Sequence, residues 1–192
     1  MRQFIIILFL FISGNLIAQH GDKESFVNEV YKLVIKSNIP YFKLSKEAHP
    51  IHNDIFNEFS GLKGVLPDTI TSQILNNNSF DTIKQFWDCQ KLTQADCVEE
   101  DSIGIITGTD IRTNSLQSQK QLHRYYRHRS KMPWYDKTVY FFSKPIYDDR
   151  KEYAVISMSY TCGRLCGYGC MYVFKKNNND WTLIAKLNCW IS

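Results

Sequence analysis

Hydrophobic positions in the first half of the chain recur every three to four residues, which is the spacing of an amphipathic helix. One such set lies between positions 26 and 34 and a second between positions 51 and 59. Either Asp22 or Ser25 can cap the first set through a side-chain oxygen. The pattern therefore predicts two helices in the N-terminal half.

The last third of the chain has a different pattern, in which apolar residues gather in dense runs. Four stretches rich in β-branched and aromatic residues predict four consecutive strands. They are Val139–Phe142, Tyr153–Tyr160, Met171–Phe174 and Trp181–Ala185. Their short connectors imply antiparallel neighbours. We therefore expect an α+β fold, with N-terminal helices packed on a C-terminal antiparallel β-meander of about four strands.

The first residues have the pattern of an export signal. Arg2 precedes an apolar run from Phe4 to Ile12, and Leu16-Ile17-Ala18 then offers a cleavage site, with cleavage after Gln19 as an alternative. The run is shorter than the roughly 20 residues that cross a hydrocarbon core. Residues 1–18 are thus predicted to be a signal peptide and residues 19–192 a single α+β domain, exported to the periplasm or out of the cell.

Composition narrows the possible partners. The chain of 192 residues has a formal net charge of +4, and removal of residues 1–18 takes away one basic residue. Nucleic-acid binding requires basic residues concentrated on one face rather than a slight overall excess, so no nucleic-acid partner is expected. The high aromatic content supplies enough apolar surface for the core of one domain.

Six cysteines in an exported chain predict a disulfide framework. Cys89 and Cys97 lie close together and would close a small loop. If the chain folds back at residues 165–167, Cys162 comes to lie opposite Cys170, whereas Cys189 could instead meet Cys166 or Cys170. The spacing is poor for a zinc site, so no metal is predicted. The disulfide candidates are Cys89, Cys97, Cys162, Cys166, Cys170 and Cys189.

A basic segment from 123 to 135 interleaves cations with aromatic rings, in a region that the polar stretch 114–121 predicts to be helical. Arginine binds phosphate, sulfate or carboxylate in a bidentate manner, and aromatic rings stack on sugars. The alternative is an ordinary solvated helix surface whose other face, with Leu122, Tyr125, Tyr126 and Arg129, docks on the sheet. The possible polyanion-binding residues are Arg124, Tyr126, Arg127, Arg129, Lys131 and Trp134.

No catalytic or cofactor-binding motif is present in the sequence. His49 and His52 lie close together, but Pro50 prevents the continuous helix that aligns zinc ligands. The acidic residues at 96–101 lack the spacing and central glycine of a calcium loop. We therefore predict no catalytic residue, metal or cofactor.

The C-terminal third, about residues 139–192, contains the segments Ser143-Lys144-Pro145-Ile146-Tyr147, Tyr153-Ala154, Cys162-Gly163, Cys166-Gly167-Tyr168-Gly169, Tyr172, Lys175-Lys176 and Trp181. Through these segments it resembles a group of uncharacterised exported bacterial proteins. Their shared pattern is a serine–proline strand start, a Cys-Gly-x-Leu-Cys-Gly-x-Gly turn and a final strand entered through Asn or Gly and Trp; this chain adds Cys170. The resemblance implies a hairpin and export but no activity.

Together these patterns favour an exported, soluble, disulfide-stabilised binding or accessory protein without enzymatic activity. Its partner would be a protein or an anionic polysaccharide. Two alternatives remain open at this level. One is a small secreted hydrolase acting on cell-wall or polysaccharide substrates, and the other is an inhibitor or immunity-type protein.

Overall fold

The computed structural model describes residues 22–35, 40–49, 51, 59–77, 84–99, 102–103, 116–163 and 166–192. The predicted signal peptide and most of the predicted helix at 51–59 lie outside these residues. The predicted N-terminal helix is present as α2 (Asp22–Val30), which continues into a π-helical turn, η1 (Tyr31–Ile35).

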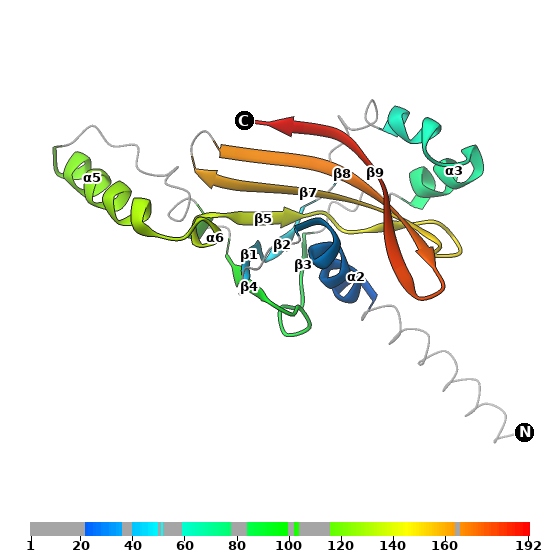
Figure 1. Cartoon of the computed structure of the whole chain (residues 1–192), viewed down its shortest axis with the longest axis horizontal. Helices are drawn as coiled ribbons and strands as arrows, with labels where there is room; N and C mark the ends of the chain where they lie inside the picture. The colour runs from blue at the N-terminus through cyan, green and yellow to red at the C-terminus, as the bar shows by residue number, and fades with distance from the viewer. Residues whose placement is uncertain are drawn as a thin grey trace, which may run out of the picture.

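A mixed sheet of seven strands dominates the molecule (Figure 1). Its order is β4-β1-β5-β7-β8-β9, and β6 also pairs with β7. The predicted four-stranded antiparallel meander is therefore wrong, because β1 pairs in parallel with both β4 and β5. The strands are β1 (Phe42–Ser45), β4 (Ala95–Val98), β5 (Val139–Phe142), β6 (Ile146–Tyr147), β7 (Tyr153–Gly163), β8 (Cys166–Asn177) and β9 (Asp180–Ile191).

The parallel pairing of β1 explains why the sequence pattern gave the wrong sheet topology. β1 and β4 have four residues each, and the segments that connect β1 to its two neighbours are long. Parallel neighbours need long crossover connections, so connector length gives no signal for this pairing. All four segments predicted as strands do lie in strands, at β5, β7, β8 and β9. A separate two-stranded sheet joins β2 (Glu47–Ala48) to β3 (Gln85–Phe86).

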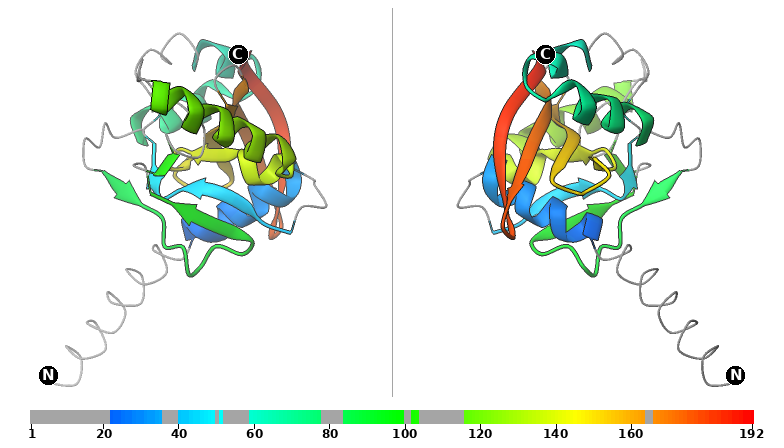
Figure 2. Two further views of the ribbon diagram at one scale, coloured as in Figure 1. Left: turned by 90° about the vertical axis from the view of Figure 1, so that its left-hand side faces the viewer. Right: turned by 90° about the vertical axis from the view of Figure 1, so that its right-hand side faces the viewer.

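Apolar side chains cover both faces of the sheet, which is the second departure from the predicted fold. Successive residues of β7 point to opposite faces, and accordingly Ile156 belongs to one buried cluster and Val155 to the other. Phe26 of α2 packs in the first cluster, and Ile74 of α3 (Asp68–Asn77) packs in the second. Figure 2 shows α2 and α3 on the two sides of the sheet. A 3-10 helix, η3 (Phe59–Gly64), adds Leu62 to the second cluster.

The hairpin that joins β7 to β8 turns earlier than the sequence suggested. Gly163 pairs with Cys166, and Cys170 lies opposite Met158 rather than opposite Cys162. The connection thus contains two residues instead of a turn centred on Cys166. Gly163 has a φ of 148°, a backbone conformation that favours glycine.

Candidate anion-binding surface

Helix α5 (Leu116–Lys131) extends beyond the end of the sheet and carries the predicted basic segment (Figure 1). No acidic residue lies between Asp110 and Asp136 in the sequence. The charges on this helix are therefore not compensated by carboxylates on the helix itself. The short helix α6 (Trp134–Lys137) follows and leads into β5.

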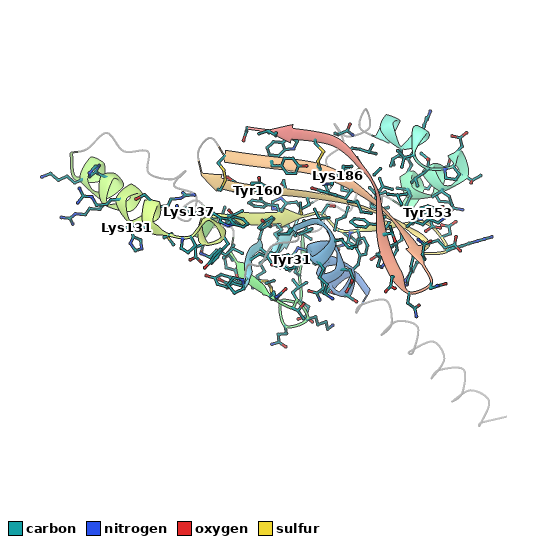
Figure 3. All side chains as sticks on the ribbon, viewed as in Figure 1. Tyr31, Lys131, Lys137, Tyr153, Tyr160 and Lys186 are labelled. Atoms are coloured by element: carbon teal, nitrogen blue, oxygen red, sulfur yellow. A yellow bond between two sulfur atoms is a disulfide. The ribbon has the colours of Figure 1, made fainter. Side chains whose placement is uncertain are left out.

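Four cations of α5 share one helix face, and we call them the cationic stripe. Lys120, Arg124, Arg127 and Lys131 are spaced by four, three and four residues, and all four are exposed. At 100° per residue, this spacing keeps the four side chains within about 60° of one another around the helix axis. Figure 3 labels Lys131 beside α5, of which it is the last residue. His123 and His128 are also exposed and flank the stripe.

Arg129 was predicted to bind polyanions, but its place in the structure is internal. Its exposed fraction is 8%. The guanidinium donates hydrogen bonds to the backbone carbonyl oxygens of Lys137, at 3.4 Å, and of Cys162. Arg129 lies half a turn from Lys120 around the helix. It therefore anchors α5 to the β7–β8 hairpin and is not available to a ligand.

Trp134, at the start of α6, has an exposed fraction of 52% and lies at the sheet end of the stripe. Its ring centroid lies 6.2 Å from that of Tyr135, which in turn contacts Tyr41 edge-on at 5.7 Å. The side chain of Tyr126, another predicted ligand residue, is outside the described part of the structure.

A polar junction beneath these rings was not predicted from the sequence. Tyr41 donates a hydrogen bond to the Asp136 carboxylate, and Lys43 Nζ donates to the Asp136 carbonyl oxygen at 2.8 Å. The hydrogen bond to Asp136, together with burial, raises the pKa of Tyr41 to about 12. Because these partners are more than 90 residues apart, no local pattern could have revealed the junction.

Among the described residues, the two buried carboxylates have structural partners. Glu24 accepts a hydrogen bond from the Asp88 amide at 3.3 Å and lies 3.6 Å from Lys23 Nζ. Asp148 accepts a hydrogen bond from the Tyr153 amide at 2.7 Å, within the turn between β6 and β7. Each carboxylate therefore accepts a hydrogen bond from a backbone amide and holds that segment of backbone in place.

Three disulfides cross-link the chain: Cys89–Cys97, Cys162–Cys166 and Cys170–Cys189. The first is the local bridge expected from the sequence, and the third is one of the alternatives left open for Cys189. Three disulfides indicate an oxidising compartment outside the cytosol. None of the described helices is both long and apolar enough to cross a membrane.

Known proteins offer no match to this chain, whether as family models, curated proteins or solved structures. The resemblance of the C-terminal hairpin to other exported proteins therefore stays a prediction. What the geometry defines is a class: a disulfide-linked mixed-sheet domain with a cationic helix at one end.

Proposed function

We propose that this chain is an exported binding protein that holds an anionic polysaccharide on the cationic stripe of α5. The observation that carries the proposal is the alignment of four exposed cations on one helix face with no carboxylate on the helix. A solvated helix normally mixes charges of both signs, because pairs of opposite charge stabilise it. The predicted export and the three disulfides agree with a ligand outside the cytosol.

The dimensions of the stripe suit an extended polymer. From Lys120 to Lys131 the helix rises about 16 Å, so a cation recurs at roughly every turn. Arg124 and Arg127 can each bind a sulfate or carboxylate in a bidentate manner, while Lys120 and Lys131 act as point charges. Such exposed charges contribute chiefly through long-range attraction that salt screens.

The exposed ring of Trp134 favours a polysaccharide over other linear polyanions. Its exposed fraction is 52%, and its ring contacts that of Tyr135 edge-on. An indole face exposed beside a row of cations can stack on a sugar ring while the cations bind the acidic groups. Inorganic polyphosphate offers no such ring.

The test is a binding titration of the mature protein with heparin, a sulfated polysaccharide, over a range of salt concentrations. The variant Arg124→Gln/Arg127→Gln should bind roughly ten-fold more weakly at low salt and lower the salt slope by about two units. A matched control, Lys63→Gln/Arg150→Gln, removes two exposed cations elsewhere and should bind like the wild type.

Two results would contradict the proposal. Absence of wild-type binding to heparin and to a carboxylated polysaccharide such as polygalacturonate at low salt would remove it altogether. Equal losses in the two double variants would show attraction to net charge rather than a site on α5. Trp134→Ala should weaken binding to heparin but leave binding to inorganic polyphosphate unchanged.

A further inference from the structure

We infer that the Cys162–Cys166 disulfide is a site of reversible thiol–disulfide exchange with an external dithiol, whereas the other two bridges are structural. This inference concerns the tip of the β7–β8 hairpin and does not depend on the proposed polysaccharide ligand. It rests on the accessibility of the sulfurs, the charge beside them and the length of the loop that each bridge closes.

Accessibility separates the three bridges. Cys166 is exposed and is the first residue of β8, and Cys162 is partly exposed and lies one residue before the end of β7. Cys89 and Cys97 pack against the larger apolar cluster. A thiolate must approach a disulfide sulfur directly, so the hairpin bridge presents the most open target.

The Cys170–Cys189 bridge has one exposed partner, but its other sulfur is a poor leaving group. Cys170 has an exposed fraction of 2%. Attack on Cys189 would release a thiolate from Cys170 inside the apolar cluster, where a charge is disfavoured. The bridge is therefore protected even though Cys189 reaches the surface.

Arg129 supplies the opposite environment at Cys162. Its guanidinium donates a hydrogen bond to the Cys162 carbonyl oxygen. A fixed cation next to a cysteine stabilises its thiolate, so Cys162 is the favoured leaving group and Cys166 the favoured point of attack.

The exchange then runs in two steps. A thiolate of the external dithiol attacks Cys166 Sγ, which forms a mixed disulfide and releases the Cys162 thiolate. The second thiol of the dithiol attacks its own sulfur in the mixed disulfide and releases the Cys166 thiolate. Two electrons pass from the dithiol to the protein, the dithiol becomes a disulfide, and its two protons go to the cysteines.

Loop length allows the fold to survive this reduction. Cys162 and Cys166 are four residues apart, compared with eight and nineteen for the other pairs. A bridge that closes a short loop restricts the unfolded chain least, so its opening costs the folded state least. A site that cycles between two redox states has to keep its fold in both of them.

The experiment uses mature protein treated with graded dithiothreitol, then alkylated, digested with trypsin and analysed by mass spectrometry. Trypsin cleaves after Arg164 and Lys186, so Cys162, Cys166 and Cys189 fall in different peptides. Label should enter Cys162 and Cys166 at least about ten-fold faster than the other four cysteines, while near-ultraviolet circular dichroism remains native. In Cys162→Ser/Cys166→Ser, this fast phase should disappear.

The inference is overturned if another bridge opens first or at the same rate, or if Cys162 and Cys166 take up label only as the native signal is lost. A fast phase that persists in the double variant would also overturn it. As a readout of positioning, Arg129→Gln should slow labelling of Cys162 and Cys166 and leave the rate at Cys89 unchanged.

Discussion

The projecting helix α5 and the hairpin sheet β7–β8–β9 hold their structures by different means. The sheet segments bury apolar side chains on both faces and carry two of the three disulfides. The described side chains of α5 are exposed apart from Arg129, whose hydrogen bonds to two carbonyl oxygens attach the helix to the rest of the molecule.

Because of this difference, substitutions on α5 and substitutions in the sheet should affect different properties of the protein. Substitutions on the exposed face of α5 should change binding and leave the free energy of unfolding within about 0.5 kcal/mol. Substitutions at the contact between the sheet and α2 should lower the free energy of unfolding and leave binding unchanged. The four predictions below test this division, from the largest expected effect to the smallest.

Phe26→Ala should have the largest effect on stability, because it removes a buried ring from the contact between α2 and the sheet. Phe26 is 2% exposed and contacts the rings of Phe174, Trp181 and Tyr147 edge-on, at centroid distances of 5.4, 4.8 and 5.7 Å. The cavity should lower the free energy of unfolding by about 3–5 kcal/mol in a urea titration. Trp134→Ala is the matched control at an exposed ring and should change it by less than about 0.5 kcal/mol. Similar losses of unfolding free energy in Phe26→Ala and Trp134→Ala would refute the proposed difference between the two regions.

Removing each disulfide of the sheet should show how much that disulfide contributes to the free energy of unfolding. By loop length alone, Cys170→Ser/Cys189→Ser should cost about 3 kcal/mol and Cys162→Ser/Cys166→Ser about 2 kcal/mol. The first pair is also the more buried, which should widen the gap. Denaturant midpoints of the two double variants provide the measurement, and a larger loss from the hairpin pair would reverse the ranking.

Gly169→Ala should disturb the packing between β8 and β9. A Cβ at this position would lie 2.5–2.7 Å from atoms of the Trp190 indole, so the ring has to move. We expect a loss of about 1–3 kcal/mol and a change in tryptophan fluorescence. Gly64→Ala is the control, because nothing lies within 4 Å of a Cβ there. An unchanged stability in Gly169→Ala would mean that the ring moves at no cost.

The polar junction between Tyr41 and the Asp136 carboxylate of α6 should respond to alkaline pH. The hydrogen bond to Asp136 raises the pKa of Tyr41 to about 12, above the ordinary value of 10.0. A raised folded-state pKa gives stability that is complete below pH 10 and is lost as the pH rises through about 12. The stability difference between wild type and Tyr41→Phe, measured by denaturant titration across this window, should shrink. A constant difference would exclude this coupling.

The sequence revealed the parts of the fold that have local patterns. The helical spacing before Pro40 and the four apolar runs after Pro133 correspond to α2 and to β5, β7, β8 and β9. The parallel pairing of β1 had no such pattern, since its partners come from residues 95–98 and 139–140. Distant pairing depends on burial that appears only once the core has formed.

The candidate sites show the same limit. The spacing of Arg124, Arg127 and Lys131 places them on one helix face, which is readable from the sequence alone. Arg129 looked like a further ligand residue because its partner, the Cys162 carbonyl, lies 33 residues away. The cysteine pairing depended on whether the hairpin turn held two residues or more, and the glycines around it permit either.

The outer edge of β9 bears on how copies of this chain meet one another. As the last strand of the sheet, β9 is a twelve-residue edge on which a second chain could add a strand. Two irregularities interrupt its ladder with β8, and Asn188, which lies within the one nearer the C-terminus, has a φ of 52°. Lys186, over the ring of Tyr172, adds a charge near the middle. An incoming strand would meet a bent, charged rim instead of a straight row of amides, which opposes growth of the sheet into fibres.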